Sequence, residues 1–200
     1  MVVNLQFSSH NKIMRNLILK SGLIIIFFNT LLLNAIEIGD SVPIFEAIDS
    51  KGKKWSSNQF NNKKGILLFF YPAAMTGGCT KQACAYRDDL DIWKKKNFEI
   101  IGISGDQVEN LSIFAKSENI PFTLLSDPTG KVAKLFNVPT SKGGKIERFV
   151  NGDRYTLERG ITTKRWTFLI SKNGKLLFKN ERVNAAMDSA HVLKFVEENK

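Results

Sequence analysis

An unbroken apolar run, Ile66 to Tyr71, constrains the fold of this chain more than any other feature of its sequence. A run of strand length without polar alternation is typical of a strand that is covered on both faces. Phe98 to Ser104 has a similar pattern and predicts a second buried strand. Helices must flank such strands, so the sequence predicts an α/β domain.

The remaining patterns alternate between helix and strand along the chain. They predict helices over 79–95, 108–118, 131–136 and 186–198, and short strands over 38–45, 122–125, 166–170 and 176–179. Asn173-Gly174 indicates a hairpin turn between the last two strands. The stretch 139–163 is polar and contains glycine, and no element is predicted there. A hairpin that follows strand–helix alternation predicts a mixed central sheet flanked by helices.

The first 35 residues differ from the rest of the chain. A basic region ending at Lys20 precedes an apolar run over 22–33, and the small residue Ala35 follows. This order is typical of an export signal. We therefore expect a leader over residues 1–35, cleavage near Ala35, and one domain over 36–200 that resides in a periplasm or an organellar lumen. A membrane anchor over 21–38 and an organellar transit peptide are the alternatives.

The charge and the histidines narrow the function classes. The 200 residues carry a formal net charge of +10, but part of it lies in the leader, and the densest later run, Lys94 to Lys96, is short. A short run favours a solvated helix end over a nucleic-acid site. His191 is the only histidine outside the leader. A structural zinc site needs four Cys or His ligands, so no metal site is expected.

Cys79 and Cys84 are the only cysteines in the chain. An even number in an exported protein is typical of a structural disulfide. However, five residues of α-helix separate two Cα atoms by roughly 8–9 Å, whereas a disulfide needs less than about 7 Å. The two cysteines therefore cannot bridge inside the intact predicted helix, and a bond between them requires its first turns to unwind.

Cys79 stands where Gly77 and Gly78 lead into the predicted helix. Unpaired N–H groups and the positive end of the helix dipole point toward a side chain at this position. They stabilise a thiolate, which is the species that attacks a peroxide oxygen. The position indicates a reactive thiol rather than a structural one.

The segment over 70–88 resembles the active site of the peroxiredoxins, whose signature places a proline, a threonine four residues later and a cysteine three beyond that. Here these residues are Pro72, Thr76 and Cys79. The Cys-Thr-Lys-x-x-Cys pattern and the following Arg-Asp are similar to the bacterioferritin comigratory protein, or peroxiredoxin Q, branch. The order of the predicted elements resembles the thioredoxin-like fold.

The resemblance implies a role for each candidate site residue. Cys79 attacks the peroxide, Thr76 offers its hydroxyl to the sulfur or to a peroxide oxygen, and Pro72 shapes and shields the turn. Arg165, just before the predicted strand over 166–170, holds the thiolate and polarises the peroxide, since arginine is charged at all relevant pH values. Cys84 resolves the oxidised Cys79. A helix-start residue is the alternative for Thr76, a surface charge is the alternative for Arg165, and some members resolve differently.

The resemblance covers 38–199 and implies a thiol-dependent peroxidase that reduces hydrogen peroxide and organic hydroperoxides to water and alcohols. It implies a monomer without metal, haem or flavin, which forms a sulfenic acid and then an intramolecular disulfide recycled by a thioredoxin-like dithiol reductant. A thioredoxin-like thiol–disulfide oxidoreductase, normally with Cys-x-x-Cys, and a redox-sensing binding module are the alternatives. Gly77 departs from the branch, which often has proline there. For Tyr86 and Arg87 a structural role stands beside a functional one, and neither is placed in the site.

Overall fold

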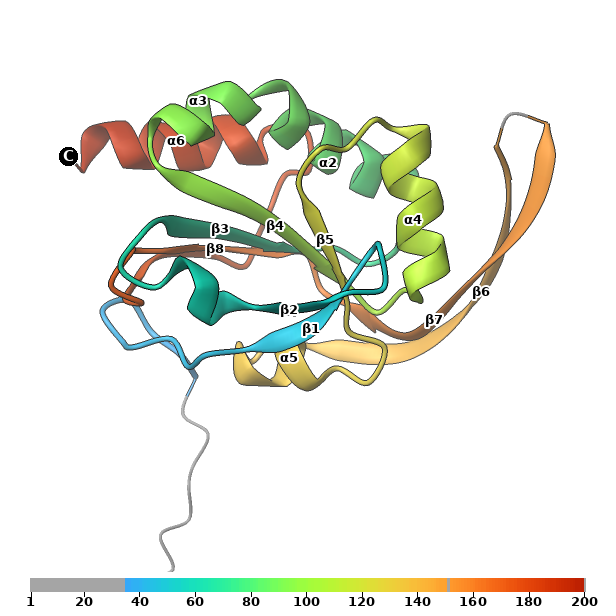
Figure 1. Cartoon of the computed structure of the whole chain (residues 1–200), viewed down its shortest axis with the longest axis horizontal. Helices are drawn as coiled ribbons and strands as arrows, with labels where there is room; N and C mark the ends of the chain where they lie inside the picture. The colour runs from blue at the N-terminus through green and yellow to red at the C-terminus, as the bar shows by residue number, and fades with distance from the viewer. Residues whose placement is uncertain (1–34, 151, 200) are drawn as a thin grey trace, which may run out of the picture. The chain divides into compact units, whose positions relative to one another are not determined.

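A seven-stranded sheet organises residues 35–150 and 152–199, which are the residues that the computed structural model describes. Its strands are β1 (Glu46–Asp49), β2 (Lys54–Ser56), β3 (Gly65–Phe70), β4 (Phe98–Ser104), β5 (Thr123–Ser126), β8 (Trp166–Ile170) and β9 (Leu176–Asn180). The strand order is β2-β1-β5-β4-β3-β8-β9 (Figure 1). The parallel β3–β4 and β4–β5 pairs lie inside antiparallel edges, so the predicted mixed sheet is confirmed.

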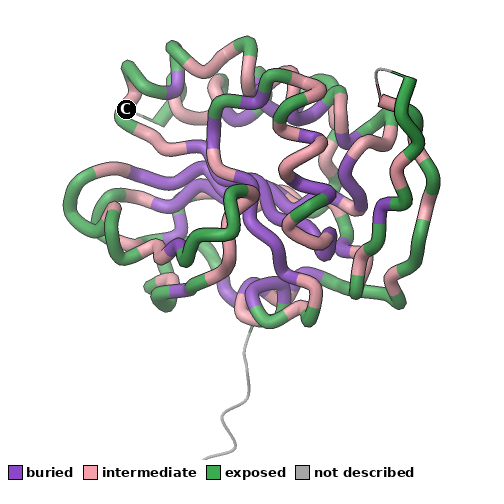
Figure 2. Tube along the Cα trace, turned by 45° about the vertical axis from the view of Figure 1, so that its right-hand side comes forward, coloured by how far each residue is buried: buried purple, intermediate pink, exposed green. Residues whose placement is uncertain are grey.

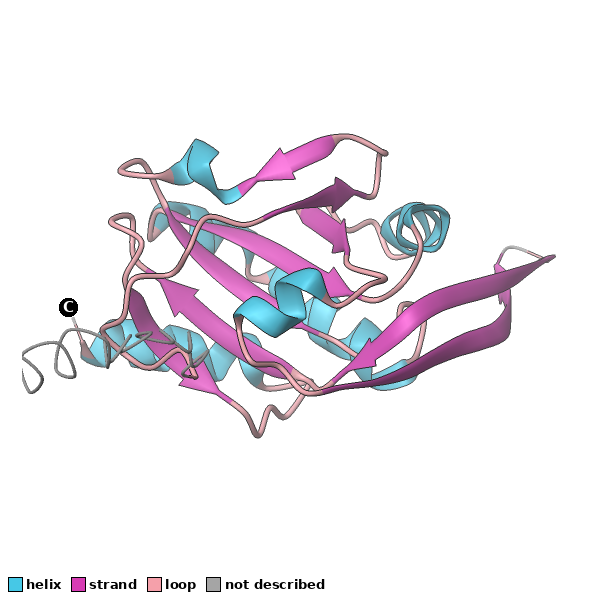
Figure 3. Ribbon diagram, turned by 90° about the horizontal axis from the view of Figure 1, so that it is seen from below, coloured by secondary structure: helices cyan, strands magenta, loops and turns pink. Residues whose placement is uncertain are grey.

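Helices lie on both faces of this sheet (Figures 1 and 3). They are η1 (Ser57–Phe60), α2 (Gly77–Asp88), α3 (Leu90–Lys95), α4 (Val108–Ser117), α5 (Lys131–Leu135) and α6 (Asp188–Glu198). In Figure 1, α2, α3 and α6 lie above the central strands and α5 lies below them. Within the described ranges, no helix combines the length and the apolarity that a bilayer crossing requires.

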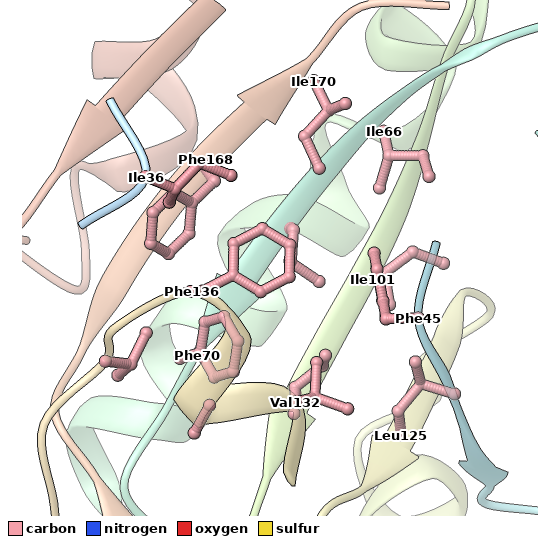
Figure 4. Close-up of a cluster of buried hydrophobic side chains, with 14 of the residues drawn as sticks. Ile36, Phe45, Ile66, Phe70, Ile101, Leu125, Val132, Phe136, Phe168 and Ile170 are labelled. Carbon is pink, nitrogen blue, oxygen red and sulfur yellow. The ribbon is translucent and has the colours of Figure 1, made fainter. Parts of the chain in front are cut away.

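The apolar run that dominates the sequence forms β3, and all six of its residues are buried. Successive side chains of a strand point to opposite faces, so Leu67 and Phe69 join the core beneath α2, whereas Leu68 and Phe70 join the core against α5. Figure 2 shows this buried centre of the sheet, and Figure 4 shows the α5-side cluster around Phe70. The prediction of a strand covered on both faces is confirmed.

One predicted helix, 79–95, is wrong in its extent. The helix begins at Gly77 and stops at Asp88, and α3 begins at Leu90 after a break at Asp89. Asp89 and Asp91 lie at the start of α3, where acidic residues meet the positive end of a helix dipole, so they favour a new helix start at this point. The predicted edge strand over 38–45 is also wrong, because Ser41 alone forms a β-bridge there, an isolated one with Lys175.

The stretch 139–163, for which no element was predicted, forms a long antiparallel hairpin. Its strands are β6 (Thr140–Val150) and β7 (Asp153–Thr163), and they pair with each other as a separate two-stranded sheet. Figure 1 shows the hairpin extending away from the central sheet. Only Lys164 and Arg165 separate the end of β7 from the start of β8, so the hairpin leads directly into Arg165.

Candidate active site

Cys79 lies in the first turn of α2, and its side chain is buried, with 1% of its surface exposed. The helix begins at Gly77 after the N-cap Thr76, whose side chain makes no capping hydrogen bond. The N–H groups at the start of a helix have no intrahelical partner, so they direct partial positive charge toward the Cys79 side chain. This placement agrees with the predicted helix start at the glycines.

Arg165 reaches Cys79 from the link between β7 and β8. Its Nη2 donates to Cys79 Sγ at 3.3 Å, and its Nη1 donates to Gln82 Oε1 at 2.6 Å. A Cβ at Gly78 would lie 3.2 Å from Nη2, so the glycine leaves room for the guanidinium beside the sulfur. Two candidate residues far apart in the sequence therefore meet, and the cation lies where a thiolate would form.

Gln82 belongs to this site, although the sequence analysis did not include it. Its side chain is fully buried one turn after Cys79, and its Nε2 donates to Asp188 Oδ2 at 2.7 Å. The signal that could have identified it is its spacing, because residues three apart lie on the same face of a helix. A polar residue beside a candidate nucleophile on a buried face needs a hydrogen-bond partner.

Asp188 is the first residue of α6, and one of its carboxylate oxygens accepts three hydrogen bonds. Oδ2 accepts from Gln82, from the Tyr86 hydroxyl at 2.6 Å and from the Thr167 hydroxyl at 2.6 Å. Burial raises the pKa of Asp188, and the three hydrogen bonds act in the opposite direction. Tyr86, which the sequence analysis did not place in the site, thus contacts the carboxylate that also holds Gln82.

The loop between β3 and α2 carries Pro72 and Thr76. The Thr76 hydroxyl donates to the carbonyl of Ala73 at 2.9 Å rather than to Cys79 Sγ. Its oxygen therefore retains acceptor capacity toward a ligand. Pro72 is half-buried in the same loop. Arg165 therefore contacts the Cys79 sulfur, whereas the Thr76 hydroxyl donates its hydrogen bond to the loop backbone.

Three contacts from other elements hold this loop. The Ala74 N–H donates to Asp106 Oδ2 at 2.8 Å, and the Thr163 hydroxyl at the end of β7 donates to the carbonyl of Tyr71 at 2.9 Å. Nε of Arg148 in β6 donates to the carbonyl of Met75 at 3.0 Å. The β6–β7 hairpin therefore supports the loop at two points.

Cys84 lies in the same helix as Cys79, and both are free thiols. Its Sγ lies 3.8 Å from Glu118 Oε2. Burial and the Glu118 carboxylate raise the pKa of Cys84, while Arg87 opposes this shift. Arg87 also donates to the carbonyl of Glu118 and pairs with Asp88, so its contacts are on the Cys84 side of the helix. The net shift favours the neutral thiol of Cys84 in the folded arrangement.

Comparisons with known proteins identify similar sequences. A model of the AhpC/TSA family matches residues 38–179. The chain is 38% identical over 145 residues to a protein named "Peroxiredoxin Q, chloroplastic" of Sedum lineare, covering 72% of this chain and 69% of that protein. It is 39% identical over 144 residues to "Peroxiredoxin Bcp" of Escherichia coli, covering 72% of this chain and 85% of that protein. It spans about half of a wheat protein of the first name, at 46% identity over 108 residues.

Solved structures give the same result. The peroxidoxin BcpB of Mycobacterium tuberculosis matches with a TM-score of 0.68 and 30% identity, over 82% of this chain and 99% of that one. A PrxQ mutant of Xylella fastidiosa matches with a TM-score of 0.68 over 83% of this chain and 98% of that one, and at 20% identity it shows the shared fold alone.

Proposed function

We propose, on the premise that this chain belongs to the AhpC/TSA family and is a thiol-dependent peroxidase, that Cys79 is the nucleophile that attacks the hydroperoxide. One observation carries this assignment: the Arg165 guanidinium lies 3.3 Å from Sγ at the first turn of α2. A fixed cation and a helix N-terminus both favour the thiolate over the thiol. Cys84 lies away from the helix start, and burial and the Glu118 carboxylate raise its pKa although Arg87 opposes this shift.

The first chemical step is a two-electron oxidation of the Cys79 sulfur. The thiolate attacks the terminal oxygen of the hydroperoxide, so an S–O bond forms while the O–O bond breaks. The departing alkoxide or hydroxide takes up a proton and leaves as alcohol or water. Arg165 donates hydrogen bonds to the negative charge as it moves from sulfur to oxygen. The Thr76 oxygen accepts a hydrogen bond from the peroxide O–H, and Pro72 limits access of water.

The second step joins Cys79 and Cys84. The Cys84 sulfur attacks the sulfenic acid, the S–O bond breaks, and water leaves as the disulfide forms. Because both residues lie in α2, the first turns of that helix must open before the sulfurs meet. A thioredoxin-like dithiol then reduces the exposed disulfide, which returns the protein to its starting state as a monomer.

The predicted leader completes the proposal. We propose that residues 1–35 direct the domain over 36–200 across a membrane, into a periplasm or an organellar lumen. The basic-then-apolar order of the leader supports this, and several relatives are named chloroplastic, whereas the Escherichia coli relative is not. N-terminal sequencing of the mature protein from its native cells should begin near Ile36. A mature protein that begins at Met1 would instead favour an anchor over 21–38.

A matched pair of cysteine variants tests the chemistry. Cys79→Ser should abolish peroxide consumption, because serine has no accessible anion at this position. Cys84→Ser should still consume one equivalent of peroxide but lose dithiol-supported turnover, because recycling needs the disulfide. Mass spectrometry after stoichiometric peroxide should find sulfenic or further oxidised Cys79 in the second variant only.

Three outcomes would contradict the assignment. Near wild-type turnover by Cys79→Ser would remove Cys79 from the mechanism. Rapid insulin reduction by the wild type together with slow peroxide consumption would favour a thiol–disulfide oxidoreductase. If peroxide reacts no faster than with free cysteine, the protein is a redox-sensing module.

A further inference from the structure

Asp188 connects three parts of the fold to the candidate active site. It is the first residue of α6 and is 1% exposed. Its Oδ2 accepts hydrogen bonds from α2 and from β8, and one of these donors is Gln82, the residue that holds Arg165. From this arrangement we infer that Asp188 is a positioning residue, which aims the Arg165 guanidinium at Cys79 through the Gln82 side chain. The inference rests on the proposed roles of Cys79 and Arg165.

The chemistry of the Gln82 amide makes this relay directional. An amide has one acceptor oxygen and one donor nitrogen, and which end faces which neighbour is set by the hydrogen bonds available. Three donors converge on Asp188 Oδ2, so that oxygen is an acceptor. Gln82 must therefore turn its NH₂ group toward Asp188, which leaves Oε1 for Arg165 Nη1 at 2.6 Å. A flipped amide would lose both contacts at once.

Arg165 depends on this contact because no acidic side chain holds it. Within residues 35–150 and 152–199, none of the salt bridges includes Arg165. Its two hydrogen bonds to side chains are those to Gln82 and Cys79. A long side chain with many rotamers keeps one orientation only if a second contact fixes it. The Gln82 carbonyl is that second contact.

Asp188 is itself held by groups that do not touch Arg165. The Tyr86 ring stacks on Phe69 with centroids 4.8 Å apart, and both Tyr86 and Thr167 are fully buried. Each of these two hydroxyls gives the carboxylate one hydrogen bond, so loss of one leaves Asp188 held by the other and by Gln82. Tyr86 and Thr167 therefore provide matched controls, since each gives Asp188 one hydrogen bond, as Gln82 does.

The test is the second-order rate constant for oxidation of Cys79 by hydrogen peroxide, measured on the full domain over a range of pH. Asp188→Ala should lower this rate constant roughly 10-fold and move the pH–rate profile to higher pH, because a loosely held guanidinium stabilises the thiolate less. Asp188→Asn should stay within about 3-fold of wild type, because its Oδ1 can take the place of Oδ2. If the alanine variant does not fold, Asp188→Ser replaces it, since serine suits a helix start but is too short to reach Gln82.

Tyr86→Phe and Thr167→Val are the controls, and each should change the rate constant by less than about 2-fold, since Gln82 still meets Asp188. If they slow oxidation as much as Asp188→Ala, Asp188 is a structural anchor and the inference fails. In a Gln82→Met background, Asp188→Ala should cause no further slowing, and an additive loss would overturn the relay. Arg165→Ala distinguishes failure of this inference from failure of the proposed function. If it slows oxidation while Asp188→Ala does not, only this inference fails, whereas an unchanged Arg165→Ala contradicts the proposed function.

Discussion

At the scale of single residues, the site depends on a contact between Cys79 and Arg165, which are 86 positions apart in the sequence. An arginine guanidinium keeps its charge throughout the relevant pH range, so it can favour a thiolate without changing its own protonation. Arg165 also presents two donors in a fixed fork, one to Cys79 and one to Gln82. A single ammonium group cannot reproduce this pair of contacts.

Replacement of this arginine should slow peroxide attack. We expect Arg165→Ala to lower the rate roughly 100-fold, as loss of a preorganised donor at a developing charge does in other enzymes. Arg165→Lys should recover only part of that loss, because lysine supplies the charge without the fork. Initial rates of hydrogen peroxide consumption from pH 5 to pH 9 measure both effects. A profile that coincides with that of the wild type would contradict the proposed role.

At the scale of secondary structure, α2 combines a reactive start with a fixed middle. Its first two residues are Gly77 and Gly78, and its N-cap side chain makes no capping hydrogen bond. Glycine lowers helix stability, so opening of the first turns costs little. Further along, Tyr86 is held by Asp188 in α6. The segment that must open to join the cysteines therefore begins at two glycines that destabilise the helix and ends before Tyr86, which is hydrogen-bonded to α6.

Proline in place of Gly77 should stabilise the first turn of α2. Thr76 is already extended, with φ −108° and ψ 145°, which is the conformation required before proline, and a Cβ at Gly77 would meet nothing within 4 Å. Proline also suits the first helical position. We expect Gly77→Pro to stabilise the reduced protein by about 0.4–1 kcal/mol and to slow formation of the Cys79–Cys84 disulfide.

Urea unfolding measures the stability of the Gly77→Pro protein, and mass spectrometry of timed samples measures disulfide formation. Gly77→Ala is the control, because it adds a side chain but restricts φ less than the proline ring does. Amide exchange around 80–85 should accelerate when the wild type is oxidised. A wild-type protein that carries the disulfide while these amides remain protected would show that α2 does not open.

At the scale of the whole molecule, three buried carboxyl groups join distant elements. Asp106 supports the loop before α2, Asp127 accepts from the N–H of Ala133 in α5, and Asp188 joins α2, β8 and α6. In each case burial raises the pKa of the carboxyl group, and hydrogen bonds oppose the shift. The folded state therefore holds these protons more tightly than the unfolded chain does.

The sign of this shift sets a prediction for stability. A raised folded-state pKa stabilises the fold fully below the unfolded-state value of about 3.9, and this stabilisation is lost as the pH rises through the folded-state pKa. Asp188→Asn removes one such group. The free energy of unfolding of the wild type should therefore fall relative to that of the variant as the pH rises above 4. Urea titrations across this range measure the free energies of unfolding of both proteins, and Asp153→Asn, at an exposed position, is the control. A wild type that gains stability relative to the Asp188→Asn variant as the pH rises would contradict the prediction.

The sequence by itself determined the elements whose signal is local. The apolar runs predicted β3 and β4 because strands covered on both faces have no polar face. Asn173-Gly174 predicted the hairpin of β8 and β9, and the two glycines placed the start of α2 beside Cys79. Each of these conclusions depends only on residues close together in the chain.

Only the tertiary structure shows that 139–163 forms a hairpin and that the site extends to Asp188. The glycines of 139–163 do not by themselves predict a strand, but they allow close backbone approach, because a Cβ at Gly143 would clash with Arg159 and one at Gly160 with Pro128. Likewise, nothing local shows that Asp188 meets Gln82. Such contacts depend on how α2, β8 and α6 pack on one sheet, and the spacing of residues within an element carries no record of the distance between elements.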